Sequence, residues 1–259
     1  MPIKRLSGAC ALAAALVLVA GCGSSGGSST GGSSTGGSAA GGSGGGSTSA
    51  STPSASPSPT ATPATVAQLK KIVLQPADLP GWKANPAEPD PTQQADDAQM
   101  ASCVGVKNTD EDQVATSGSD DFSLGDATIS SSASSYKSPS DLDVDLAVLH
   151  SPKFDSCETQ LMSKGIAESL PQGSRVGTMS LKITPQPGGD WPANVVGIGT
   201  ASVPVTVNGQ QVTLYADFAA ITGPLIEADV EAENVGAPVP AAALRAAIVA
   251  VAHRAATGS

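Results

Sequence analysis

Acidic and apolar residues alternate between positions 226 and 233 of this chain, and the acidic ones are Glu227, Asp229, Glu231 and Glu233. An alternation with period two predicts a β-strand, on which carboxylates at alternate positions lie about 6.6 Å apart. A calcium ion takes about six to eight oxygen ligands that converge on one point. Because four carboxylates in a row at this spacing do not converge, the pattern favours a solvated acidic face over a calcium site.

Two other motifs lack the residues or the context that their function requires. Residues 141–145 begin like a calcium-binding loop, but Leu146 stands where that loop needs glycine and Pro152 where it needs a glutamate. Ser134 and Lys137 have the Ser-x-x-Lys spacing of penicillin-recognising enzymes, but they lie in a β-prone stretch and no Lys-Thr-Gly follows. Outside the glycine-rich residues 23–46, the sequence also has no Gly-x-Ser-x-Gly nucleophile elbow and no phosphate-binding loop. We therefore expect no catalytic residue, no metal site and no cofactor.

The N-terminus has the layout of a secretory signal. Lys4 and Arg5 precede an apolar run over residues 9–20, and this run of about 12 residues is shorter than the roughly 20 that cross a bilayer. Residues 19–22, Val-Ala-Gly-Cys, resemble a bacterial lipobox, in which the cysteine is diacylated and becomes the new N-terminus. We expect a signal peptide over 1–21 and a lipid on Cys22, which would anchor the protein to the cell membrane so that it faces the extracytoplasmic side or the cell wall. An ordinary secretory signal without lipid is the competing interpretation.

Residues 22–65 are almost entirely Gly, Ser, Thr, Ala and Pro. A segment of this composition has no apolar side chains to bury and is expected to be a disordered linker. The remainder, 66–256, is long enough for a single α+β domain. With only 3% aromatic residues, its core must be built from Val, Leu, Ile and Ala. The formal net charge of -10 disfavours nucleic acid as a partner, because phosphates repel an acidic surface.

Cys103 and Cys157 are the two cysteines that fall in the predicted domain. Their separation is not typical of a metal site, and an even pair outside the cytoplasm predicts a disulfide. The bridge would close a loop of about 55 residues and stabilise the domain by about 4 kcal/mol in the chain-entropy model.

Helices are predicted in three parts of the domain. A short amphipathic helix should run from Val66 to Leu74, followed by a turn over residues 78–82, and residues 84–121 should form a long loop with one helical turn near Cys103. Ser138 and Pro139 predict a helix start, Ser151-Pro152 a second one, and Pro240 a last helix through Ala255.

Strands are predicted mainly in the second half. The pair Asn208-Gly209 is typical of a two-residue hairpin turn, and it predicts that Val205 pairs with Val212 and Val203 with Leu214. Pro204 should then lie at a sheet edge or a bulge, because it has no N–H to donate. Together these elements predict an α+β fold, with an antiparallel sheet of four to six strands, helices packed on it and one disulfide.

Several of these features together resemble a known group of proteins. They are the lipobox, the low-complexity linker, the Asp78-Leu79-Pro80-Gly81-Trp82 turn, the Cys103/Cys157 pair and the closing alanine-rich helix. The combination resembles actinobacterial lipoproteins of the extracytoplasmic "sensor domain" type and, more distantly, the extracellular sensor domains of mycobacterial serine/threonine kinases. The resemblance implies an antiparallel sheet with flanking helices and a cleft for a ligand. The kinase sensors have two disulfides where this chain has cysteines for one. A second group of actinobacterial lipoproteins, with an α/β/α sandwich, has nearly the same order of elements.

From this we expect a non-catalytic, lipid-anchored envelope protein that binds a small molecule, a lipid or a protein partner in a sensor or accessory role. Its contact with the membrane would be through the N-terminal lipid. Trp82 and Trp191 are the candidates for lining a ligand pocket, although a half-buried tryptophan is usually part of a core. The alternatives are a cell-wall enzyme and a purely structural envelope protein.

Overall fold

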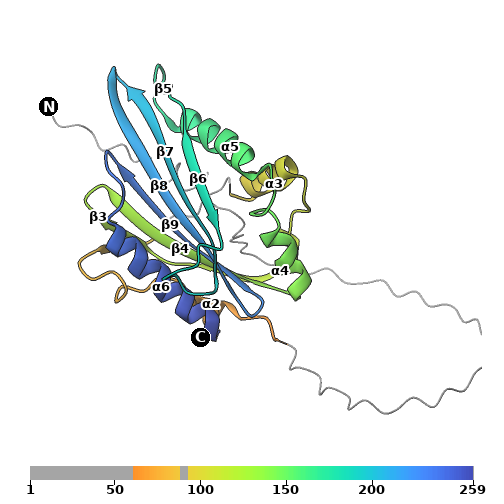
Figure 1. Ribbon diagram of the computed structural model, residues 1–259. Coiled ribbons are helices and arrows are strands. Elements are labelled where there is room, and N and C mark those ends of the chain that lie inside the picture. Colours follow the sequence, from red (N-terminus) through yellow and green to blue (C-terminus); the bar gives the residue numbers. More distant parts are fainter. Residues whose placement is uncertain (1–60, 88–92, 259) are drawn as a thin grey trace, which may run out of the picture. The chain divides into compact units, whose positions relative to one another are not determined.

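The computed structural model describes residues 61–87 and 93–258 (Figure 1). The predicted signal peptide, the predicted lipid attachment at Cys22 and the predicted linker up to residue 60 lie outside the described residues and stay predictions. Within 61–87 and 93–258, no helix combines the length and the hydropathy that a membrane crossing requires.

The described part of the chain is organised around an antiparallel sheet of nine strands. Their spatial order is β1-β3-β4-β9-β8-β7-β5, with β2 also paired to β4 and β6 also paired to β7. The strands are β1 (Lys83–Asn85), β2 (Gln113–Gly118), β3 (Asp121–Leu124), β4 (Ala127–Tyr136), β5 (Arg175–Val176), β6 (Ser180–Pro185), β7 (Val195–Val207), β8 (Gln210–Gly223) and β9 (Ile226–Val235).

The prediction of an antiparallel sheet with helices is confirmed, but the expected four to six strands are too few. The strands that the sequence did not reveal are short or polar, for example β1 with three residues and β5 with two. Such strands carry too few side chains for a period of two to be visible. The region 84–121 was also wrongly expected to be a loop, since it contains helix α3 (Gln93–Val104) and strand β2.

The predicted hairpin between β7 and β8 is confirmed in its register. Val205 pairs with Val212, Val203 with Leu214, and Pro204 stands opposite Thr213. On the other side of β7, β5 reaches as far as Val205, and β6 begins pairing at Ser202. Pro204 therefore lies where the neighbouring edge is interrupted, and its missing N–H leaves no ladder hydrogen bond unmade.

Helices cover both faces of the sheet (Figure 1). Helices α2 (Val66–Ile72) and α6 (Ala241–Thr257) pack on one face, against side chains that include Ile226, Ala228 and Val230 of β9. Helices α3 and α5 (Phe154–Ser169) pack on the other face, against β7 and β8, and α4 (Pro139–Leu146) lies on this side too. Because successive residues of a strand point to opposite faces, the two sides of β9 meet different helices.

Two helix starts follow the capping rules. Thr65 and Gln68 form a capping box, in which each side chain accepts a hydrogen bond from the other residue's backbone N–H. Ser138 accepts a hydrogen bond from the Asp141 N–H at 3.3 Å, with Pro139 in the first turn of α4. Helix α5 begins at Phe154, slightly later than predicted.

Hydrogen bonds between Asp78 and Arg254 connect the turn that follows α2 to helix α6. The Asp78 carboxylate accepts hydrogen bonds from both terminal nitrogens of Arg254, at 3.0 and 2.8 Å, and from the Gln75 N–H at 2.8 Å. Arg254 also donates to the carbonyls of Ile72 and Val73, at 3.0 and 3.1 Å. Burial alone would raise the pKa of Asp78, but the hydrogen bonds and the charge of Arg254 hold it below its ordinary value.

Candidate functional site

The acidic side chains of β9 are buried, so the prediction of a solvated face is wrong. Glu227, Asp229 and Glu231 are 2%, 6% and 9% exposed, and Glu233 is half-buried. The alternation along the strand was identified correctly, but it does not tell whether the polar side meets water or another layer of protein. Here helices cover both faces of the sheet (Figure 1). Glu231 stands opposite Phe218, whose side chain belongs to the core that packs against α3 and α5, so the acidic side of β9 lies on the side of these helices.

The neighbouring strand β4 contributes hydroxyl side chains to the same face. In the antiparallel ladder, Ser134 stands opposite Glu227 and Ser132 opposite Asp229, and opposed residues project to the same side. Tyr136 follows on this side of β4 and is fully buried. We call the side chains of Glu227, Asp229, Glu231, Glu233, Ser134 and Tyr136 the acidic face.

Helices α3 and α5 bring two further carboxyls toward the acidic face. Asp97 of α3 is 4% exposed, and Glu158 of α5 is 1% exposed. Electrostatic repulsion from Glu231 acts on both side chains. The carboxyl groups of three separate elements, β9, α3 and α5, are thus gathered between the sheet and these helices.

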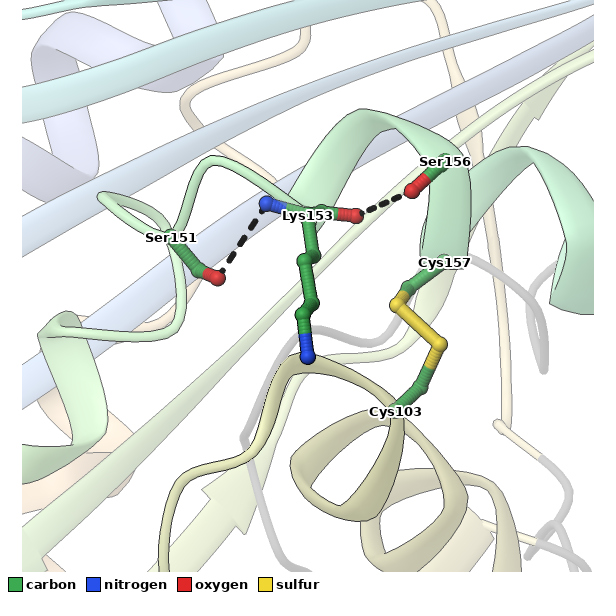
Figure 2. The surroundings of a disulfide bond; sticks show 5 residues. All are labelled: Cys103, Ser151, Lys153, Ser156 and Cys157. Carbon is green, nitrogen blue, oxygen red and sulfur yellow. Dashed lines mark hydrogen bonds between the residues drawn. A yellow bond between two sulfur atoms is a disulfide. The ribbon is translucent and has the colours of Figure 1, made fainter.

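The predicted disulfide holds these two helices together and is confirmed. Figure 2 shows Cys103 of α3 bonded to Cys157 of α5, with a Cα–Cα distance of 5.9 Å. The start of α5 is fixed in the same region, where Ser156 donates to the Lys153 carbonyl at 2.8 Å and the Lys153 N–H donates to Ser151 at 3.3 Å (Figure 2). Since Glu158 directly follows Cys157, the bridge fixes the helix segment that carries this carboxyl.

A hydrogen-bonded network closes one end of the acidic face. The Tyr136 hydroxyl lies 2.5 Å from Oδ2 of Asp145 and 3.0 Å from Oε2 of Glu227, and Thr109 donates to Oδ1 of Asp145. The tyrosine has one proton for two carboxyls, so both contacts are hydrogen bonds only if one carboxyl is protonated. Burial and the charge of Asp145 raise the pKa of Glu227 well above its ordinary value, which identifies Glu227 as the protonated member.

Burial also raises the pKa of the other carboxyls on and around the face. It raises the pKa of Asp97, Glu158 and Glu231 to about 8 each. The pKa values of Asp229 and Glu233 are raised well above the ordinary range by burial and by the charge of Glu231. The charged groups that act on these carboxyls are themselves carboxyls, with Asp96, Asp110, Asp121 and Asp145 in addition to the acidic face.

Several buried oxygens at this site have no hydrogen-bond partner among the described residues. They are both carboxyl oxygens of Asp97, Oε1 of Glu158, Oδ2 of Asp229, Oε1 of Glu233 and Oγ of Ser134. Native proteins leave few buried polar atoms unpaired, so a group of them in one place requires an explanation. Among residues 61–87 and 93–258, no group of three His, Cys, Asp or Glu side chains is placed to hold a metal ion.

The two tryptophans considered from the sequence lie on the opposite side of the sheet. Trp82 and Trp191 are half-buried against the apolar core beneath α2 and α6, and Arg245 of α6 stacks over the Trp191 ring at 4.8 Å from its centre. The structure therefore does not bring either of them to the acidic face. A role for them in ligand binding stays a prediction without a pocket assigned to it.

Sequence reasoning missed most residues that complete the site. Asp97 lies in the region expected to be a loop, and its helix has no apolar periodicity that would have placed it. Asp145 could have been found, because it follows Leu142 by three residues in a predicted helix and therefore shares its inward face. The remaining motifs are structural: residues 141–145 lie within α4, and the Lys137 amine donates to the Glu111 carbonyl rather than to Ser134.

Comparisons with protein-family models, with curated proteins and with solved structures found no match to this chain.

Proposed function

We propose that this protein is a lipid-anchored component of the cell envelope, and that its folded domain binds a ligand at the acidic face without catalysing a reaction. Cys22 would carry the lipid, and residues 22–65 would hold the domain away from the membrane surface. The support for the anchor is the basic start, the short apolar run and the Val-Ala-Gly-Cys sequence at residues 19–22. The domain would act as a sensor or accessory protein.

The observation that carries the binding proposal is the set of unpaired buried oxygens between the sheet and the helices. A purely structural protein gains nothing from gathering such groups, because burying a polar atom without a partner is unfavourable by about 1–3 kcal/mol. A ligand that supplies the missing hydrogen bonds removes this penalty. The disulfide supports the same interpretation, since it fixes α3 and α5 relative to each other next to the site.

One observation favours the enzyme alternative. Asp145 and Glu227 form a carboxyl pair of the kind that shares one proton, and such pairs occur in acid–base catalysis. However, both side chains are 2% exposed, and Tyr136 and Thr109 occupy their hydrogen-bonding positions. A satisfied and buried pair is better placed to stabilise the fold than to reach a substrate, so we favour binding over catalysis.

Native mass spectrometry of the full-length protein tests both parts of the proposal. The protein would be purified in a mild uncharged detergent from membranes of an actinobacterial host and measured in gentle and in denaturing spray. We expect a chain that begins at Cys22 with a diacyl modification, and a discrete extra mass that is present only in gentle spray. A Cys22→Ala variant is the matched control: it should lose the lipid mass and keep the ligand mass.

The two parts can fail separately. A mature chain without lipid would contradict the anchor, whatever is bound to the domain. An identical polypeptide mass in both modes of spray would contradict ligand binding and favour the structural alternative.

A further inference from the structure

The unpaired groups on and around the acidic face need the same kind of hydrogen-bond partner. Asp97, Glu158 and Asp229 have carboxyl oxygens without a partner, and these side chains are 4%, 1% and 6% exposed. Once they are ionised, carboxyl oxygens only accept hydrogen bonds, so the partner of the ionised form must be a donor. The Ser134 hydroxyl, fully buried and also without a partner, is an independent polar group on the same face, opposite Glu227 in the ladder.

The charges around the acidic face restrict the chemical class of the ligand. The side chains whose charges act on these carboxyls are themselves carboxyls, and they come from α3, α4, β3 and the short 3-10 helix Asp110–Asp112 as well as from β9. No lysine, arginine or histidine among the described residues contributes to these interactions. When these carboxyls are ionised, an anion would be repelled and a neutral ligand would leave buried negative charge uncompensated. The complementary ligand is a cation.

Spacing decides between a metal ion and an organic cation. The carboxyls do not converge on a point in the way that a metal requires. Asp229 and Glu231 are instead alternate residues on one strand, about 6.6 Å apart. Two primary amines joined by four methylene groups are about 6 Å apart when extended, from standard bond lengths. The charge spacing of a short diamine therefore matches the repeat of the strand.

The neighbouring strand places apolar side chains beside two of these carboxyls. Ala220 of β8 stands opposite Asp229, and Phe218 stands opposite Glu231, and both side chains are buried on the same side of the sheet. Beyond them lies the apolar core under α5, which includes Met162 and Ile166. Carboxyls beside an apolar row suit a molecule with charged ends and a hydrocarbon middle.

We propose that the acidic face binds a linear organic dication, with ammonium groups joined by a short aliphatic chain, and that Asp97, Glu158, Asp229 and Glu231 pair with these groups. This inference rests on the proposed function and names the chemical class of its ligand. In the free protein the carboxyls are protonated at neutral pH, because burial raises the pKa of Asp97, Glu158 and Glu231 to about 8. An ammonium group replaces these protons on binding, so binding releases protons and becomes tighter as the pH rises from 6 to 8.

The test is calorimetric titration of the full-length protein in uncharged detergent with butane-1,4-diamine. Dialysis at pH 5 first removes bound cations, since the carboxyls are then protonated. Titrations in two buffers with different heats of ionisation measure the protons released. Butane-1,4-diol, which has the same chain without charge, and calcium chloride are the comparison ligands. We expect binding by the diamine with proton release, and no binding by the diol or by calcium.

Asp97→Asn and Glu231→Gln are the informative variants, because each removes a charge at nearly constant volume. Each should weaken diamine binding about tenfold or more, the effect of losing one charge-assisted hydrogen bond. Asp155→Asn, an exposed position on the same helix as Glu158, is the matched control and should leave binding unchanged. Circular dichroism would establish that all variants are folded.

The outcomes separate this inference from the proposed function. Equal binding of diamine and diol, competition by calcium, or an equal effect of Asp155→Asn and Asp97→Asn would overturn the dication. If the diamine does not bind but native mass spectrometry finds another ligand, the dication is wrong and the binding function stands. If neither experiment finds a ligand, the dication and the proposed ligand-binding function are both wrong.

Discussion

Individual carboxyl groups decide how this domain responds to its surroundings. Glu231 lies in the middle of β9, with Phe218 of β8 opposite it, and burial raises its pKa to about 8. Its pKa in the unfolded chain is near 4.5. Between these two values the folded protein binds a proton that the unfolded chain releases, so its contribution to stability is complete below pH 4.5 and is lost as the pH rises toward 8.

Glu231→Gln should therefore stabilise the free protein at pH 8 and change little at pH 5. The expected gain at pH 8 is roughly 2–4 kcal/mol, because each unit of pKa difference corresponds to about 1.4 kcal/mol. Urea unfolding at both pH values measures it. Glu111→Gln, at an exposed position of the 3-10 helix, is the control and should show no gain at either pH. A variant that is less stable than the wild type at pH 8 would contradict a buried Glu231 with a raised pKa.

At the scale of the elements, two ties hold helices in place. The Cys103–Cys157 bridge joins α3 to α5, and Arg254 joins α6 to the end of α2 and to Asp78. The first tie holds the carboxyls of α3 and α5 close to the sheet. The second keeps α2 and α6 packed on the apolar side of the same sheet.

Removing the disulfide should destabilise the domain and loosen α3 first. The two cysteines are 54 positions apart, and closing a loop of that size contributes about 4 kcal/mol, or roughly 10 °C in Tm for a domain of this length. A Cys103→Ser/Cys157→Ser double variant and the reduced wild type should agree in Tm. Hydrogen exchange should accelerate most in α3, which loses its covalent tie to α5. Unchanged Tm on reduction would show that the bridge does not constrain the fold.

Asp78→Ala should lower the free energy of unfolding by about 2 kcal/mol, because it leaves the Arg254 guanidinium without its carboxylate partner. The loss should be seen at pH 7 and diminish in acid, since the lowered pKa means that the carboxylate contributes only above its ordinary titration range. Denaturant unfolding at pH 7 and pH 3 makes this comparison. Asp143→Ala on the exposed side of α4 is the control. If Asp78→Ala and Asp143→Ala lowered the free energy of unfolding equally, the contact between Asp78 and Arg254 would not stabilise the fold.

The parts of this fold that could be predicted are those in which a short stretch of sequence specifies its own structure. The β7–β8 register followed from one Asn-Gly turn and the apolar alternation on either side, and the start of α4 followed from Ser138-Pro139. The disulfide could be predicted because the domain has an even number of cysteines and is expected outside the cytoplasm. Strands β1, β2 and β5 and helix α3 have no such signal, because their short or polar sequences are held by tertiary contacts. The burial of β9's acids could not be predicted, since it depends on α3 and α5 covering that side.

At the scale of the whole molecule, the acidic face gives the domain an unusual dependence on pH. Asp97, Glu158 and Glu231 have pKa values of about 8 in the folded state and ordinary values in the unfolded chain. Asp96, Asp110, Asp121 and Asp145, which act on them, are also acidic, so their charges add to the effect. Stability should be greatest near pH 4–5 and decrease as the pH rises to 8.

Thermal unfolding of the dialysed protein across this range measures the trend. We expect Tm to fall by several degrees between pH 5 and pH 8, and a bound cation to reverse the fall by stabilising the ionised carboxyls. The groups with lowered pKa values, such as Asp78, act in the opposite direction only at more acid pH. A Tm that rises steadily from pH 5 to pH 8 without ligand would contradict the account.

Carbon-13 NMR titration of the Asp and Glu carboxyl carbons shows whether carboxyls from β9, α3 and α5 are buried together between the sheet and the helices. We predict that Asp97, Glu158 and Glu231 titrate near pH 8, with Glu227 and Asp229 also protonated at neutral pH. If every carboxyl instead titrates between about pH 3 and 5, the range of ordinary solvated acids, the acidic face is open to water and the account is wrong.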